Sequence, residues 1–279
     1  MKDVPPILSE KHYGAPSVFL PENILREARR QKGIAAAIVP GVCVLDPDGD
    51  IVRYLKRTRR ARREETWACY HSELYLASEQ GMDFGLVPCA VGASYAVLIA
   101  EQLFASGCRL LISITSSGQL QELLRRPPYF VLIDKAWRDE GTSYHYLPPS
   151  EFSHAPPDLL ARLSGALADM SVPVERGAVW TTDAPFRETE QAIGAMKTKG
   201  LLAVEMEAAA LYAFAQARCK PVICFAHVTN QMARIDGDFE KGEADGAVDA
   251  LALLAAVARA RPHESGTIDA PCGSPTNAS

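Results

Sequence analysis

The sequence predicts a single α/β domain, and three observations support this prediction. A chain of 279 residues suits one domain with a substantial core and is short for two independent ones. Hydrophobic residues make up 48% and charged residues 23%, the balance of an ordinary globular protein. Between residues 84 and 115 an apolar run, an Ala-rich helical stretch and a second apolar run follow one another, which is typical of a βαβ unit.

The elements expected along the chain continue this rhythm. We expect strands at 35–41, 42–46, 84–92, 109–115, 130–137, 174–183 and 221–230. We expect helices at 22–32, 94–107, 157–170, 189–200, 208–219 and 246–261. The strands are apolar without alternation, which predicts a sheet covered on both faces. Residues 46–50 predict a turn, and the polar, aromatic loop at 138–152 is of the kind that builds sites.

Three segments are expected in the domain organisation. Residues 1–21 are rich in proline and predict an extended N-terminal arm. Residues 22–261 contain all the predicted elements of the domain. Residues 262–279 hold too few apolar side chains to pack, which predicts a disordered tail.

Charge and composition exclude several classes of partner. The net charge of -5 and the pI near 5.7 argue against nucleic-acid or anionic membrane binding. The basic run at residues 56–63 is expected to be a solvated helix or loop balanced by Glu64 and Glu65. No apolar run has the length of a membrane span, and the first residues lack an apolar signal core.

The seven cysteines are odd in number and scattered, without a C-x-x-C pair. This spacing predicts neither a disulfide framework nor a zinc site. With the absence of a signal core, it leads us to expect a cytoplasmic protein.

The segment ITSSGQL at 114–120 is the first candidate site. Ser116 and Ser117 offer hydroxyl donors, and Gly118 leaves backbone N–H groups accessible, a combination that suits phosphate or a ribose hydroxyl. Such a Ser-Gly turn is also common in α/β proteins without any ligand.

The segment VEMEAAAL at 204–211 places Glu205 and Glu207 where a strand leads into a helix. In extended backbone, residues two apart share a face. A carboxylate there can accept hydrogen bonds from both vicinal hydroxyls of a ribose. The alternative is that both carboxylates only favour the helix N-terminus electrostatically.

The segment TTDAPFRET at 181–189 follows a predicted strand. Phe186 could stack on a base while Arg187 contacts its polar edge. A capping turn with a surface ion pair is the alternative interpretation.

Asn230 ends the predicted strand at 221–230, in the motif HVTNQ. Its side-chain amide could donate to a ring atom or carbonyl of a base. As a lone Asn it could also be an ordinary turn residue.

These motifs, in this order, resemble the superfamily of nucleoside phosphorylases and nucleosidases, including uridine phosphorylase and bacterial purine nucleoside phosphorylase. The resemblance spans residues 34–260, and VGASYAVLIAEQL and RDEGTSYHYLPP support it. It implies a mixed, twisted, barrel-like sheet surrounded by helices. It also implies a homodimer or dimer-based homo-oligomer with sites at subunit contacts, and no cofactor or metal apart from phosphate as a possible co-substrate.

The resemblance also implies roles for single residues. Met206 and Glu207, with Glu205 beside them, would bind ribose. Ser116 would contact phosphate or the water that replaces it, while Ser117, Gly118, Phe186 and Asn230 would surround the base. His12 would reach the 5′ end of the sugar in a neighbouring subunit.

The sequence departs from the phosphorylase pattern at the phosphate site. Ser113 stands where a strand arginine is expected, His71 where the neighbouring subunit donates one, and residues 40–50 replace a glycine-rich loop. A divalent anion binds poorly without cations, and Arg62 or Arg63 would have to compensate. Asn230 replaces an acidic residue and cannot protonate a leaving base, which disfavours 6-aminopurines.

The sequence therefore predicts a pentosyltransferase of the nucleoside phosphorylase type that cleaves the N-glycosidic bond of a purine or pyrimidine nucleoside. Glu207 and Asn230 are the expected catalytic residues, with Ser116 and His71 at the phosphate or water position. Two alternatives remain open: a nucleosidase that uses water, and a catalytically silent nucleoside-binding or interaction protein.

Overall fold

The computed structural model describes residues 4–121, 126–168, 170–232 and 236–261. Within these residues the strands are β1 (Val42–Asp46), β2 (Ala61–Arg63), β3 (Tyr75–Glu79), β4 (Met82–Pro88), β5 (Leu110–Gln119), β6 (Tyr129–Asp139), β7 (Phe152–His154), β8 (Val174–Thr182), β9 (Ala203–Glu205) and β10 (Val222–Asn230). The α-helices are α1 (Pro21–Lys32), α2 (Asp50–Arg57), α3 (Ala93–Ala105), α4 (Pro157–Ala166), α5 (Glu190–Thr198), α6 (Ala208–Arg218) and α7 (Ala247–Arg259).

The strands form one mixed sheet in the order β10-β6-β8-β9-β5-β1-β4-β3-β2, and β7 pairs with β6. Strand β10 also pairs with β5, so that β5, β9, β8, β6 and β10 close into a barrel. β5 is parallel to β1 and β10 but antiparallel to β9. The predicted mixed, barrel-like sheet is confirmed.

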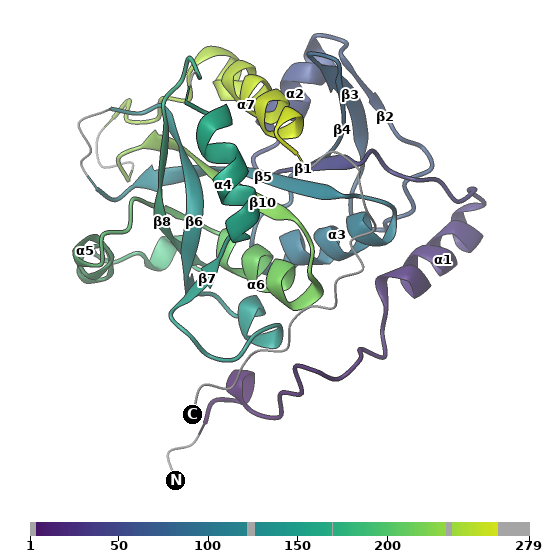
Figure 1. Cartoon of the computed structure of the whole chain (residues 1–279), viewed down its shortest axis with the longest axis horizontal. Coiled ribbons are helices and arrows are strands. Elements are labelled where there is room, and N and C mark those ends of the chain that lie inside the picture. Colours follow the sequence, from purple (N-terminus) through teal and green to yellow (C-terminus); the bar gives the residue numbers. More distant parts are fainter. Residues whose placement is uncertain (1–3, 122–125, 169, 233–235, 262–279) are drawn as a thin grey trace.

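Helices cover the sheet on both sides (Figure 1). α2 packs against α7 on one side of β1 and β5, and α3 packs against α6 on the other. The first eight residues of α6, Ala208–Ala215, are all buried, because this helix lies between the sheet and its neighbours. Its high alanine content lets backbones approach closely and needs no polar face.

Most predicted elements lie where the sequence placed them, and the exceptions have physical reasons. The segment 35–41 forms no strand, and Ile38 within it is 85% exposed. The Ser-Gly segment is no turn, because β5 continues to Gln119 while it pairs with β10 and β9. The predicted turn at 46–50 leads directly into the unpredicted helix α2.

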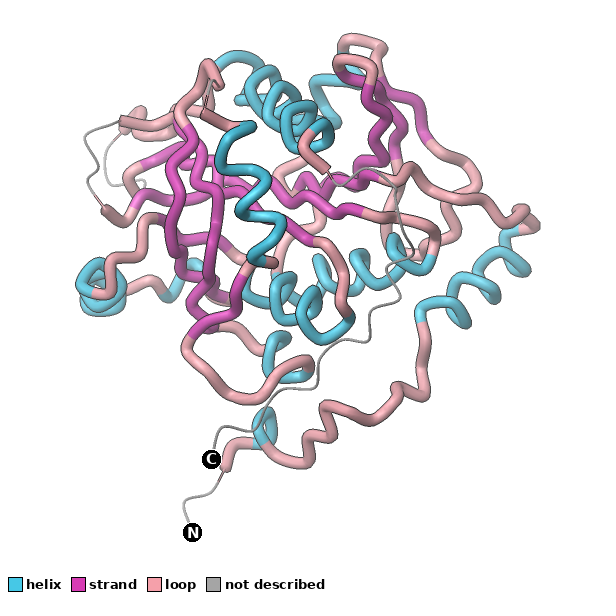
Figure 2. Tube along the Cα trace, in the orientation of Figure 1, coloured by secondary structure: helices cyan, strands magenta, loops and turns pink. Residues whose placement is uncertain are grey.

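The arm at residues 4–20 is mostly extended and exposed, with a short 3₁₀ helix at Pro6–Leu8 (Figure 2). Two polar contacts join it to the domain: Lys11 Nζ lies 2.9 Å from His145 Nδ1, and Tyr13 Oη donates to the Tyr144 carbonyl at 3.3 Å. The predicted tail at 262–279 lies outside the described residues. Cys219 is disulfide-bonded, contrary to the expectation from the cysteine spacing.

The basic run is balanced by acidic side chains, as predicted. Arg62 pairs with Glu64, and Arg63 pairs with Glu65 and Glu73. No helix in the described ranges is long and apolar enough to cross a membrane.

Replacing Tyr212 by Phe should destabilise the barrel by about 1–3 kcal/mol, the typical cost of stranding buried polar groups. The fully buried Tyr212 hydroxyl donates to the Ile133 carbonyl at 2.6 Å and accepts from Cys224 N at 3.0 Å, which links α6 to β6 and β10. Urea unfolding of the two proteins measures the difference. Tyr54→Phe on half-buried α2 is the control. An equal midpoint for both variants would contradict the structural role of this hydroxyl.

Candidate functional site

The site is built where the carboxyl ends of three neighbouring parallel strands meet. In the sheet, Leu45 of β1 lies beside Ser113 of β5, and Gly118 of β5 lies beside Asn230 of β10. Parallel strands end at the same edge of a sheet, so the side chains that follow them converge. Asp46–Asp50, Ser116–Gly118 and Asn230 therefore come together although they are far apart in the sequence.

Glu205 stabilises the start of helix α6. Its Oε2 accepts hydrogen bonds from Glu207 N at 2.7 Å and Ala208 N at 2.8 Å, and its Oε1 accepts from the Thr181 hydroxyl. These backbone N–H groups have no partner within the helix, and a carboxylate satisfies them well. Both oxygens thus already have protein partners, which supports the structural alternative for Glu205 over ribose binding.

Glu207 lies on the same junction but has a free oxygen. Its side chain is buried, its Oε1 accepts from Gly92 N at 2.7 Å, and its Oε2 has no hydrogen-bond partner among the described residues. An unsatisfied buried polar atom costs about 1–3 kcal/mol, and a charged one costs more. A ligand hydroxyl donating to Oε2 would remove this cost.

Burial raises the pKa of Glu207 to about 8, and the negative charge of Glu205 adds to the effect. The Gly92 amide and the Thr115 hydroxyl oppose it, whereas Asp48 raises the pKa further.

The hydroxyls of β5 differ in their partners. Ser117 Oγ is buried without a hydrogen-bond partner in the described structure, so it is free to bind a ligand atom. Gly118 faces Met232 and Asn230: a Cβ at this position would lie 2.6 Å from Met232 Sδ and 3.4 Å from Asn230 Oδ1. A side chain at this position would therefore require the Met232 side chain to move.

Asn230 is buried, and its amide has a defined orientation. Oδ1 accepts from Met232 N at 2.9 Å, and Nδ2 donates to Thr229 Oγ1 at 3.2 Å. The remaining contact, from Nδ2 to the Ser117 carbonyl, is 3.5 Å long and weak. One N–H of Asn230 is consequently available to a stronger acceptor.

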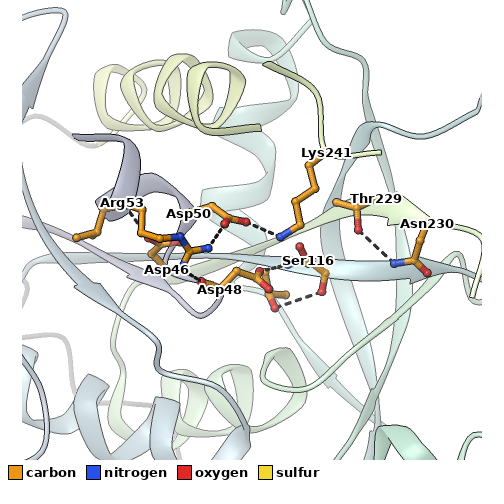
Figure 3. Close-up of polar contacts among 10 residues, drawn as sticks. Asp46, Asp48, Asp50, Arg53, Ser116, Thr229, Asn230 and Lys241 are labelled. Carbon is orange, nitrogen blue, oxygen red and sulfur yellow. Dashed lines mark hydrogen bonds and ion pairs between the residues drawn. The ribbon is translucent and has the colours of Figure 1, made fainter. Parts of the chain in front are cut away.

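Sequence reasoning treated the acidic loop at Asp46–Asp50 as a turn and as the replacement of a glycine-rich loop, and it named none of the three aspartates as a site residue. The Asp48 carboxylate accepts a hydrogen bond from Ser116 N at 2.7 Å (Figure 3). Asp46 Oδ2 accepts from Val52 N at 2.9 Å in the first turn of α2, and burial raises its pKa to about 7. The signal in the sequence was the pattern of three aspartates at alternate positions directly after an apolar strand.

Two cations counter the charge of this loop at Asp50. Lys241 Nζ lies 2.6 Å from Asp50 Oδ2, and Arg53 pairs with the other oxygen. Arg53 also donates to the Asp48 carbonyl at 2.8 Å. Neither residue was a candidate from the sequence.

The remaining predicted residues do not join this cluster within one chain. Met206 is half-buried beside Glu207, whereas His12, His71, Phe186 and Arg187 are exposed, Phe186 to 99%. Arg62 and Arg63 pair with the glutamates of their own region. No group of three or more metal-binding side chains occurs among the residues that the structure describes.

The raised pKa of Glu207 makes stability depend on pH. Between its ordinary value of 4.5 and about 8, the folded chain binds more protons than the unfolded chain, so stability should fall as pH rises through this window. Glu207→Gln should reduce the slope, because the amide does not ionise, while Asp46 and Glu205 with pKa values raised to about 7 maintain the rest of it. Urea unfolding from pH 5 to 8 measures both slopes, and an unchanged slope in the variant would contradict the assignment.

Comparisons with known proteins identify the family and the fold of the chain. Residues 42–260 match the model of the phosphorylase superfamily. A guanosine phosphorylase of Halorubrum lacusprofundi is 30% identical over 141 residues, which is 50% of this chain and 58% of the relative. The chain thus spans little more than half the length of this relative.

Solved structures of uridine phosphorylase from Vibrio fischeri have the same fold. One, in complex with 6-hydroxy-1-naphthoic acid, has a TM-score of 0.65 at 20% identity, and the match covers 80% of this chain and 91% of the chain in that structure. Another has a TM-score of 0.63 at 20% identity, and the match covers 90% of this chain and 98% of the chain in that structure. On the family match over residues 42–260, the chain belongs to the phosphorylase superfamily.

Proposed function

We propose that this protein cleaves the N-glycosidic bond of a nucleoside and transfers the pentosyl group to water. The observation that carries the proposal is the Asp48 carboxylate on Ser116 N, at the position that the resemblance assigns to phosphate. Membership of the phosphorylase superfamily supplies the reaction class, and the guanosine and uridine phosphorylases among its relatives support a nucleoside substrate.

Glu207 is the proposed sugar-binding and catalytic carboxylate. Its buried Oε2, which has no partner among the described residues, would accept a hydrogen bond from a ribose hydroxyl. Breaking the bond builds positive charge on the ribose ring, which a nearby carboxylate stabilises more in the transition state than in the ground state. Met206, half-buried beside it, would pack on the sugar.

Asp48 is the proposed general base. A carboxylate next to the acceptor position repels a phosphate dianion but attracts the proton of a water molecule. As the water oxygen bonds to the anomeric carbon, Asp48 takes one of its protons. The electron pair of the broken C–N bond passes to the base, which is finally protonated from solvent, giving free pentose and free base.

Asn230 is the proposed partner of the leaving base. With Oδ1 held by Met232 N, the amide presents an N–H group, which stabilises negative charge on a ring nitrogen or carbonyl oxygen. Ser117 and Gly118 would line the base with it. Phe186 and Arg187, exposed in the single chain, would contribute only after the loop at 185–187 moves inward.

Phosphorolysis is the second candidate, and it makes the enzyme a pentosyltransferase. Lys241 and Arg53 place two cations next to the Asp48–Ser116 contact, and phosphate could draw them away from Asp50. The phosphorylases among the relatives support this candidate. We further propose a cytoplasmic homodimer in which a second copy covers the exposed His12 and His71.

Incubation of the purified protein with purine and pyrimidine nucleosides, with and without phosphate, tests the proposal. We expect base release at equal rates in both conditions, with free pentose as the second product. Release that requires phosphate and yields pentose 1-phosphate would establish the second candidate. Binding measured as a rise in Tm without any base release would instead favour a silent nucleoside-binding protein.

The two carboxylates should respond differently to substitution. Asp48→Asn should lower kcat by roughly 10²-fold or more because it removes the general base, with little change in KM. Glu207→Ala should lower kcat by about 10²–10³-fold and also raise KM, because the sugar loses a ligand in both states. Steady-state kinetics measures both, with Asp83→Asn on the exposed β3–β4 hairpin as control. Wild-type kcat in Asp48→Asn would exclude Asp48 as the base.

A further inference from the structure

The acidic loop carries three carboxylates in five residues, and each has a separate partner. Asp46 accepts from Val52 N, Asp48 from Ser116 N, and Asp50 pairs with Lys241 and Arg53. The charges of Asp48 and Asp50 both raise the pKa of Asp46, so the three groups repel one another. Such a loop keeps one conformation only if cations offset the repulsion.

The two cations at Asp50 are not equivalent. Arg53 is three residues away on the same helix, and its side chain is 60% exposed. Lys241 comes from a segment 191 residues further along the chain, and its side chain is only 23% exposed. A half-buried ion pair is screened less by salt and water than an exposed one. Lys241 therefore ties the loop to another part of the fold, whereas Arg53 acts locally.

The segment that carries Lys241 is itself anchored above the strand ends. Glu240 N donates to the Thr229 carbonyl at 2.7 Å, directly before Asn230. Gly246, with φ 80°, packs so closely on His227 that a Cβ there would lie 2.2 Å from its ring. Figure 3 shows the Lys241 side chain extending from above β10 toward Asp50, with Ser116 and Asp48 below it.

We propose that Lys241 is a positioning residue that holds Asp48 on Ser116 N through its ion pair with Asp50. The inference rests on the proposed function for its kinetic consequence but not for its structural one. Without Lys241, repulsion among the three aspartates would move the loop away from Ser116. The Asp48 carboxylate would then leave its position at Ser116 N, while the side chains of Glu207 and Asn230 would keep their positions.

A neighbouring histidine reports on the same contact. His227 is buried and stacks on Phe130 with ring centroids 4.7 Å apart. Burial first, and the charge of Lys241 second, lower its pKa to about 4, while the charge of Asp50 opposes them. Asp50 and His227 are thus the titratable groups for which the described structure gives an interaction with Lys241. Arg53 shares Asp50 with it, and Asp249 lies next to Gly242 in the same segment.

Lys241→Met tests the proposal, with Lys241→Arg as the conservative variant. Amide hydrogen exchange at Ser116 should be at least about tenfold faster in Lys241→Met, because the hydrogen bond to Asp48 is lost. The pKa of His227, followed by NMR, should rise. Lys241→Arg should restore slow exchange. Arg176→Met, which breaks the ion pair with Asp134 on β6 and β8, is the matched control and should change neither signal.

In steady-state kinetics, Lys241→Met should lower kcat about tenfold or more at unchanged KM for the nucleoside. The acid limb of the pH profile of kcat should move to higher pH. Wild-type Ser116 exchange in a folded Lys241→Met variant would overturn the proposal. A variant with normal exchange but a raised KM for phosphate would also overturn it and make Lys241 a phosphate ligand. If the wild type releases no base, the proposed function fails, and the exchange result still decides the role of Lys241.

Discussion

The parallel pairing of β5 with both β1 and β10 is the constraint on which the site depends. It closes the barrel through β10 and brings the ends of β1, β5 and β10 to one edge. The pairing brings the loop after β1, the Ser-Gly segment of β5 and Asn230 close together. The hydrogen bond of Asp48 to Ser116 N and the ion pair of Asp50 with Lys241 then join these segments. The chemistry of the site follows from which residues stand at these strand ends.

Three buried carboxylates near this edge have different roles because their partners differ. Glu205 is satisfied by two backbone amides and the Thr181 hydroxyl, so it stabilises helix α6. Asp46 caps the first turn of α2 in the same way. Glu207 alone among these three retains a buried oxygen without a partner, which distinguishes a ligand-binding group from structural ones. Burial itself does not make the distinction, since all three have raised pKa values.

Much of this fold could be predicted from the sequence, because long apolar strands and Ala-rich helices bury their whole surface. The βαβ unit at 84–115 and helix α6 are examples. Strands β2 and β3 and helix α2 could not, since several of their residues are charged and the pairing of the strands is set by the sheet. The Ser-Gly segment was expected to be a turn, but pairing on both sides keeps it in β5.

A site residue could be predicted where a single short motif determines its position. It could not be predicted where its position depends on partners that are distant in the sequence. The junction at 204–211 identified Glu207, but Glu205 needed the structure, because its partners are backbone amides that a motif does not show. Asp48 and Lys241 were missed, because only the fold brings Asp48 to Ser116 N and Lys241 to Asp50. The roles of the exposed His12, His71 and Phe186 stay predictions, because these residues do not reach the cluster within one chain.

The central claim is that Asp48 takes the place of an anionic acceptor, and isotope labelling tests it most directly. The protein and a substrate nucleoside are incubated in H₂¹⁸O with unlabelled phosphate, and the sugar product is analysed by mass spectrometry before its anomeric oxygen exchanges. The account predicts one ¹⁸O atom at the anomeric carbon of free pentose. Pentose 1-phosphate with an unlabelled bridging oxygen would contradict it.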